Sequence, residues 1–132
     1  MKDSVGKASL QVAKGHLSSS MKSGSLGTLS SAFLIAILEE ASCNALKTAN
    51  LISGHTSVGA KLDLKLIKPT TEGSNLVAIS KITDLDQNGV HFEIDAFDEG
   101  GLVASAKHIR VFVQADEFER RCYEVARKSN LK

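Results

Sequence analysis

One segment of this sequence is predicted to be a helix that other elements must cover. From Ala32 to about Lys47 the chain contains neither proline nor glycine. Its first turns are apolar on nearly every side, at Phe33, Leu34, Ile35, Ile37 and Leu38. A helix of this kind is stable where it is buried. Ser31, or Ser30 beside it, can cap the helix, because a serine hydroxyl accepts a hydrogen bond from a free amide of the first turn.

After Gly54 the pattern changes to a two-residue period, which is typical of a strand buried on one face. The apolar members of this strand are Val58, Ala60, Leu62, Leu64 and Leu66, and Pro69 ends it. Three further strands are predicted at about 75–83, 90–97 and 102–113. We expect these four strands to form an antiparallel meander.

Turns and flanking segments complete the predicted order of elements. Asn88-Gly89 predicts a type I′ hairpin, because this dipeptide best satisfies the positive φ angles of that turn. Residues from about 5 to 12 are predicted to form an earlier strand, and the Ser/Gly-rich residues 18–31 a loop. Residues 117–128 are predicted to form a short, charged C-terminal helix.

A sheet that curls around the helix is the arrangement that covers a helix apolar on most sides. The sequence therefore predicts an α+β fold, in which an antiparallel sheet wraps around one long central helix and a short helix ends the chain. A second copy of the chain would cover the remaining open sheet edge and face. We expect a homodimer, or a higher oligomer built from it.

Composition excludes several classes of protein. The 132 residues suit one compact domain, 1–132, and 42% hydrophobic with 23% charged residues is ordinary globular usage. Sixteen Lys and Arg against fifteen Asp and Glu leave a formal charge of +1. This balance lacks the excess of one sign that a nucleic-acid binder or a polybasic membrane binder carries. We therefore expect neither nucleic acid nor a membrane as a partner.

The N-terminus and the cysteines indicate a cytoplasmic protein. Residues 1–4 turn polar without an apolar signal segment, and the longest apolar run, 32–38, is far shorter than the roughly 20 residues that span a bilayer. Cys43 and Cys122 fit neither a metal-ligand spacing nor a redox pair, so we expect reduced thiols. Neither a metal nor a cofactor is expected.

Several blocks, in this order, resemble a known family. They are SGSLGTLSSAF at 23–33, ILEEA at 37–41, TSVG at 56–59, KPT at 68–70, FDEGGLV at 97–103 and KHIR at 107–110. Together they resemble the hotdog-fold acyl-CoA thioesterases of the fluoroacetyl-CoA thioesterase type, over most of the chain from about 23 to 118. The resemblance implies a hotdog dimer with the thioester near the start of the central helix.

The family's site residues can be carried over one by one. The hydroxyl at the helix start falls on Ser31, the carboxylate two turns along falls on Glu39, and the histidine of the following strand falls on Leu66. The resemblance also implies an oxyanion role for Gly59, and Ser57 lies beside it in the same block. The family's aromatic lid has no counterpart in residues 18–24, so fluoroacetate itself is not the expected substrate.

The two neighbouring glutamates of the helix differ in their surroundings. Glu39 shares its helix face with small or apolar residues such as Ile35 and Cys43, whereas Glu40 shares its face with Asn44 and Lys47. We expect Glu39 to sit in an apolar cleft, which disfavours its charged form and suits a general base or a nucleophile. The competing interpretation is a helix carboxylate that reaches solvent at a dimer groove.

The other candidates carry competing interpretations too. Ser31 either caps the helix alone or also binds a thioester oxygen, and Gly59 marks either a bulge or a close approach of backbone to ligand. His55 could reach the site from its mouth, although a surface role is commoner, and His108 matches a family histidine outside the catalytic set. Leu66 is expected on the apolar face, lining a dry cleft beside Glu39.

The sequence thus predicts a homodimeric acyl-CoA thioesterase that hydrolyses a small acyl thioester at a dimer-interface pocket. Glu39 and Ser31 are the catalytic candidates, and Gly59, Ser57, Leu66 and His55 are the substrate-binding candidates. The alternative is a non-catalytic acyl-CoA-binding or sensing module that lost the chemistry with the family histidine. A hydratase would need an Asp/His pair in the loop before the helix, and residues 18–31 lack one.

Overall fold

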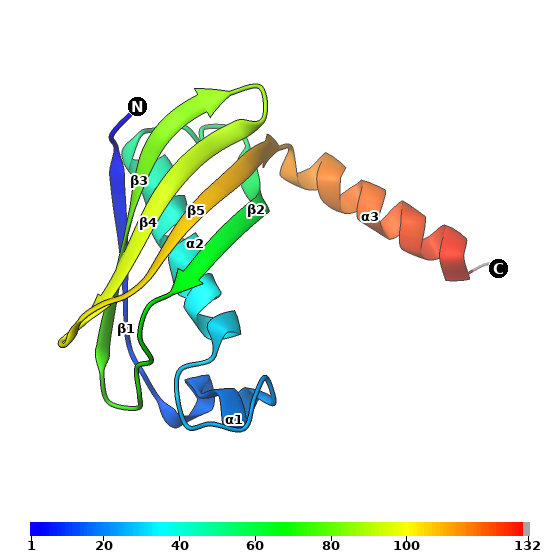
Figure 1. The fold of residues 1–132 in the computed structure, drawn as a ribbon. Coiled ribbons are helices and arrows are strands. Elements are labelled where there is room, and N and C mark those ends of the chain that lie inside the picture. Colours follow the sequence, from blue (N-terminus) through cyan, green and yellow to red (C-terminus); the bar gives the residue numbers. More distant parts are fainter. Residues whose placement is uncertain (131–132) are drawn as a thin grey trace.

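The computed structural model describes residues 1–130 (Figure 1). The elements in chain order are β1 (Val5–Gln11), the 3₁₀ helix η1 (Lys14–His16), α1 (Ser18–Met21), α2 (Ser31–Thr48), β2 (Thr56–Leu66), β3 (Asn75–Asp86), β4 (Gly89–Asp98), β5 (Gly101–Val113) and α3 (Ala115–Asn130). Every predicted strand and both predicted helices are present. The predicted loop at 18–31 also holds the short helix α1.

The five strands form one antiparallel sheet in the order β1-β3-β4-β5-β2. The meander therefore comprises only β3, β4 and β5, and the prediction that β2 continues it was wrong. β2 pairs with β5 at the far edge because the connection at residues 67–74, which contains Pro69, is long enough to carry the chain across the sheet. Alternation in the sequence indicates which face of a strand is buried, but not which strand lies beside it.

Helix α2 crosses one face of the sheet and forms the core with it (Figure 1). Its buried face contributes Leu34, Leu38, Ala41 and Ala45, among others. Strand β1 passes so close that a Cβ on Gly6 would collide with the backbone of the helix. Other side chains of α2, such as those of Phe33 and Ile35, are only half-buried, and Ala36 is exposed. One chain alone therefore covers only part of this helix.

The turn between β3 and β4 differs from the predicted one. Asp86 pairs with Gly89, so the two loop residues are Gln87 and Asn88. The φ of Asn88 is not positive, whereas Gly89 has a φ of 129°, so the dipeptide does not form a type I′ turn. A bulge between Ile82 and Asp84 shifts the register of this hairpin and places glycine after the turn instead of within it.

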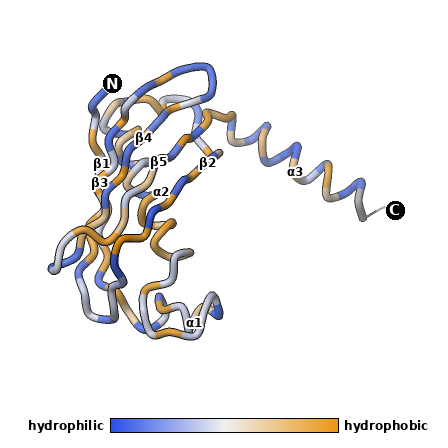
Figure 2. The backbone as a smooth tube through the Cα atoms, in the orientation of Figure 1, coloured by the Kyte–Doolittle hydropathy of each residue, from blue (hydrophilic) through white to orange (hydrophobic). Residues whose placement is uncertain are grey.

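The open edge strand β2 and helix α3 lie on the same side of the molecule (Figure 1). Helix α3 projects away from the sheet, and hydrophobic and hydrophilic residues alternate along it (Figure 2). Phe118, Tyr123 and Val125 are exposed on it. Within residues 1–130, no helix is both long enough and apolar enough to cross a membrane.

Candidate active site

Glu39 lies at a hollow of about 260 Å³ between α2 and the sheet edge formed by β2 and β5. The residues that line it are Ile35, Glu39, Gly59, Ala60, Lys61, Leu62 and His108. The side chain of Glu39 is 41% exposed, so its carboxylate can meet a ligand from solvent. Glu40 is exposed, as its helix face predicted.

A buried arginine fixes the Glu39 carboxylate. Arg110 Nη1 donates to Glu39 Oε2 at 2.9 Å, and the Arg110 side chain is 8% exposed. The same guanidinium donates from Nε to Ser57 Oγ at 2.9 Å and from Nη2 to the Ser57 carbonyl at 3.1 Å. The prediction of an apolar cleft around Glu39 was therefore wrong, because an opposite charge on β5 faces it. Ser57, predicted to bind substrate, holds Arg110.

Gly59 provides the room for this ion pair. A Cβ at Gly59 would lie 2.8 Å from Glu39 Oε2 and 3.5 Å from both Arg110 Nη1 and His108 Nε2. The register of β2 against β5 shifts at this point, between Gly59 and Lys61. The bulge and the missing side chain thus leave a small space that a carboxylate, a guanidinium and an imidazole all face.

His108 forms the floor of the hollow and belongs to a buried polar chain. Its Nδ1 lies 2.9 Å from Ser42 Oγ of α2, which in turn lies 2.9 Å from Ser80 Oγ of β3. Burial lowers the pKa of His108 to about 4, and the positive charge of Arg110 lowers it further, against the opposing effect of Glu39. His108 is therefore neutral near pH 7.

The structure does not bring Ser31 together with Glu39 in one chain. Ser30, not Ser31, is the N-cap, and its Oγ accepts from the Phe33 amide at 3.0 Å. Ser31 is exposed in the first turn, and eight residues at 1.5 Å per residue place it about 12 Å from Glu39 along the axis. Its hydroxyl stays a candidate only for a ligand that extends along the helix.

Leu66 also lies far from Glu39. It ends β2, seven residues beyond Gly59, which corresponds to about 20 Å along the strand. The prediction that it lines a dry cleft beside Glu39 was wrong within one chain, because Leu66 is 53% exposed. β2 ends at the side of the molecule where α2 begins (Figure 1).

His55 lies at the opposite end of β2 from Leu66. Its ring contacts Phe112 edge-on, with 4.6 Å between the centroids, and its Nε2 is buried with no hydrogen-bond partner within residues 1–130. Because His55 does not line the hollow at Glu39, the structure gives it a packing role.

The sequence-based interpretation missed Arg110 and underrated His108. A signal for both was present, since 104, 106, 108 and 110 share one face of β5 and that face is buried. A histidine and an arginine on a buried strand face need partners, and Ser42 and Glu39 on the facing helix supply them.

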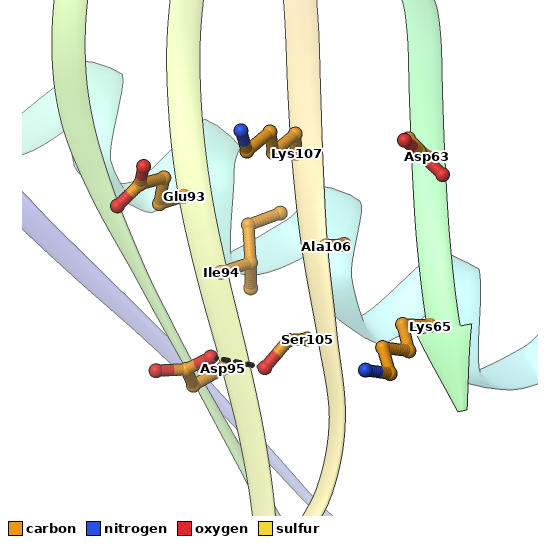
Figure 3. A pocket seen from close by; sticks show the side chains of 8 residues that line it. All are labelled: Asp63, Lys65, Glu93, Ile94, Asp95, Ser105, Ala106 and Lys107. Carbon is orange, nitrogen blue, oxygen red and sulfur yellow. Dashed lines mark hydrogen bonds between the residues drawn. The ribbon is translucent and has the colours of Figure 1, made fainter. Parts of the chain in front are cut away.

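A second hollow, of about 310 Å³, lies on the opposite face of the sheet (Figure 3). There the carboxylate of Asp95 accepts from Ser105 Oγ at 2.6 Å. Asp63 and Glu93 flank Lys107 from the neighbouring strands, so charges alternate across the sheet. Such cross-strand pairing on an exposed face is typical of a solvated surface.

Comparison with known proteins places the chain in a family. A sequence profile of the fluoroacetyl-CoA-specific thioesterase family, FlK, matches residues 12–116. The chain belongs to this family. No curated protein matches it. FlK-family membership and the observed fold together identify a hotdog thioesterase.

Solved structures agree with this family and fold. A single-residue variant of the fluoroacetyl-CoA-specific thioesterase FlK matches with a TM-score of 0.84 and 13% identity, over 94% of this chain and 96% of the other. A thioesterase superfamily member from Thermus thermophilus matches with a TM-score of 0.89 and 12% identity, over 100% and 97%. A hot-dog-like protein from Thermanaerovibrio acidaminovorans matches with a TM-score of 0.80 and 20% identity, over 93% of this chain and 90% of the other. At identities this low, the structural likeness establishes the hotdog fold and nothing further.

The hollow at Glu39 offers hydrogen-bonding groups but no metal site. Within residues 1–130, no three His, Cys, Asp or Glu side chains lie close enough together to hold a metal ion. Glu39, Lys61 and His108 are the titratable residues that line it, and Arg110 donates to Glu39 from behind. Such a set can bind a carbonyl, hold water and accept a proton.

Proposed function

We propose that this protein hydrolyses a small acyl-CoA thioester at the hollow beside Glu39. The observation that carries the proposal is the Glu39 carboxylate, which is open to ligand on one side and held by a buried arginine on the other. Membership of a thioesterase family supports the reaction type. Structures of FlK hold fluoroacetate with CoA, or acetyl-CoA, which supports a CoA thioester as the substrate class.

The proposed chemistry is hydrolysis of the bond between the acyl carbon and sulfur. A water oxygen attacks the carbonyl carbon while Glu39 accepts the proton that this water loses. The C–S bond then breaks, the thiolate leaves with a proton, and the products are a carboxylic acid and the CoA thiol. If Glu39 attacks the carbon itself, the C–S bond breaks as an acyl anhydride forms at the carboxylate, the thiolate leaves and takes up a proton, and water then hydrolyses the anhydride. In both routes Arg110 keeps the carboxylate oriented.

The two routes differ in where an oxygen label goes. A single turnover in ¹⁸O water places the label in the acid product when Glu39 acts as base. When Glu39 is the nucleophile, water attacking the enzyme-derived carbonyl of the anhydride transfers label to the carboxylate. Label in the peptide that contains Glu39, detected by mass spectrometry, shows a nucleophilic Glu39, whereas label in the acid alone also arises when water attacks the acyl carbonyl of the anhydride.

The proposal includes a dimer in which two copies meet along β2. This strand is an open edge of 11 residues, and natural proteins cover long edges of this kind. Leu66 and Ile67 at its end are 53% and 46% exposed, so a second copy would bury apolar surface there. The hollow at Glu39 lies between α2 and this edge, so its outer wall would come from the second copy. Light scattering that finds a monomer at micromolar concentration contradicts this arrangement.

A short acyl group is proposed because structures of FlK hold fluoroacetate with CoA, or acetyl-CoA. A turnover screen over short, branched and aryl acyl-CoAs, with detection of the free thiol, tests both the reaction and the chain length.

Glu39→Gln tests the carboxylate itself. The variant keeps the shape of the side chain and an oxygen that accepts from Arg110, so the fold should survive while turnover falls roughly a hundredfold or more. Glu40→Gln is the matched control, since Glu40 is the exposed neighbour on the same helix. Equal turnover in both variants and the parent would exclude Glu39 from catalysis.

The alternative function is acyl-CoA binding without hydrolysis. The observation that favours it is the residue at position 66, where the resemblance implies the family histidine and the chain has leucine, which cannot carry a proton. If calorimetry shows the parent binding acyl-CoA while every thioester in the screen stays intact, the protein is a binding module.

A further inference from the structure

A buried hydroxyl chain fixes the imidazole of His108 from behind. Ser80 and Ser42 are fully buried, and His108 is 2% exposed. The chain runs from Ser80 Oγ to Ser42 Oγ and on to His108 Nδ1, with 2.9 Å for each step. It joins β3, α2 and β5, so three elements of the core hold the ring in one orientation.

The direction of the hydrogen bonds from Ser80 through Ser42 to His108 decides which ring nitrogen of His108 carries the proton. If Ser80 donates to Ser42 and Ser42 donates to Nδ1, both buried hydroxyl protons have an acceptor. In the opposite direction the Ser80 proton would need a further acceptor, and within residues 1–130 its only recorded partner is Ser42. A buried donor without an acceptor costs about 1–3 kcal/mol. The first direction is therefore favoured, and it leaves the proton of the neutral ring on Nε2.

Nε2 faces the space beside Gly59. The position of a Cβ on Gly59 is 3.5 Å from His108 Nε2, 3.5 Å from Arg110 Nη1 and 2.8 Å from Glu39 Oε2. His108 and Glu39 both line the hollow, so a ligand carbonyl oxygen that enters it can approach Nε2. A fixed N–H donor at the carbonyl oxygen stabilises the charge that develops there.

We propose that His108 is a catalytic residue, which donates a hydrogen bond from Nε2 to the carbonyl oxygen of the bound thioester, and that Ser42 and Ser80 are positioning residues that fix its tautomer. This inference rests on the proposed thioesterase function. It assigns the polarising role to a strand histidine that the sequence-based interpretation placed outside the catalytic set.

The surroundings of His108 suit a neutral donor. The charged groups that face it are Glu39 of α2 and Arg110 of its own strand, and Phe92 of β4 packs against its ring. Burial and Arg110 lower the pKa of His108 to about 4, so the ring is neutral near pH 7. A neutral imidazole can donate from Nε2 without transferring its proton.

Two matched variants of His108 test the donor. His108→Gln places an amide N–H near the position of Nε2, whereas His108→Asn reaches only as far as the Nδ1 side and leaves no donor at the position of Nε2. We expect kcat to fall about a hundredfold in the Asn variant and less than tenfold in the Gln variant. Equal losses of kcat in both variants would show a structural role only and would overturn the proposal.

The tautomer is measurable without any activity. Two-bond ¹⁵N–¹H correlation spectra report which ring nitrogen of His108 is protonated. We expect the proton on Nε2 in the parent, and a mixture of tautomers in Ser42→Ala, which removes the donor to Nδ1. A proton on Nδ1 in the parent contradicts the proposal whatever the kinetics show.

A further measurement separates this proposal from the thioesterase function. An acyl-CoA analogue with a ketone in place of the thioester keeps the carbonyl and cannot be hydrolysed, and the matching alkyl thioether lacks the carbonyl. If His108 binds the carbonyl, the parent and His108→Gln prefer the ketone and His108→Asn loses that preference, even if the parent hydrolyses nothing. Equal affinity of the parent for both analogues overturns the proposal.

Discussion

The two faces of β5 carry similar residue types in opposite circumstances. On the face toward α2, Arg110 and His108 are 7% and 2% exposed, and their side-chain atoms have partners on other elements. On the outer face, Lys107 is exposed and lies between Asp63 and Glu93 of the neighbouring strands (Figure 3). Both faces border a hollow, so burial and convergence of polar groups, rather than charge or concavity, mark the candidate site.

The two faces of β5 differ in the free-energy cost of carrying a charge. A charge on the inner face must be compensated by specific partners, because burying it unpaired costs several kcal/mol. A charge on the outer face keeps its water, and a cross-strand pair there contributes about 0.2–1 kcal/mol. A fold that needed only stability would place apolar residues at 108 and 110. That β5 keeps polar groups there is the reason to look for chemistry on the inner face.

Removing the charge of Arg110 should cause the largest loss in the free energy of unfolding. Arg110→Met keeps the length of the side chain but leaves Glu39 and Ser57 without their donor. We expect the free energy of unfolding to fall by about 3 kcal/mol, at the low end for a broken buried pair because the Glu39 side chain is 41% exposed and can take up water. Urea denaturation measures it. A loss below about 0.5 kcal/mol would mean that the Arg110–Glu39 pair contributes no more to stability than an exposed pair on the outer face.

Acid should destabilise the protein through the inner face. The pKa of His108 is about 4 in the folded chain and about 6.5 in the unfolded one, so the unfolded state binds more protons between these values. Stability is therefore fully present above about pH 6.5 and falls as the pH drops toward 4. From pH 7 to pH 5 we expect a loss of about 2 kcal/mol in the free energy of unfolding.

Matched variants of two histidines test whether His108 causes this pH dependence of stability. His108→Gln should remove most of it, since glutamine does not titrate. His91→Gln should retain it, because His91 lies on the outer face, where its Nε2 pairs with Asp86 at 3.0 Å. If the slope between pH 7 and pH 5 survives in His108→Gln, another group is responsible for it.

Much of the fold could be predicted from local patterns. The helix at 31–48, the alternation in β4 and the turn glycines all reflect short-range physics. The place of β2 beside β5 could not be predicted, because it depends on a chain crossing that leaves no periodic signal. The turn at Asn88 differed for a related reason, since a bulge at Ile82 changed the register that the dipeptide alone would set.

The site was predictable only in part. Glu39 and Gly59 could be found, because helix spacing and a glycine inside a strand are local features. Arg110 could not be paired with Glu39 from the sequence, since 71 residues separate them and their contact depends on the packing of α2 against β5. Ser31 and Leu66 were chosen by resemblance, and the structure places both about 12–20 Å from Glu39 by helix and strand rise.

The smallest effect should come from the outer face. Lys107→Met removes a cation from the same strand, three residues from Arg110, and creates the same side chain as the Arg110 variant. Because Lys107 is exposed and its neighbours Asp63 and Glu93 stay hydrated without it, we expect the free energy of unfolding to change by less than about 0.5 kcal/mol. Turnover should stay within about twofold of the parent, because the hollow at Glu39 does not include this residue. A loss of turnover comparable to that of Glu39→Gln would mean that the outer hollow takes part in the reaction, and the distinction between the two faces would fail.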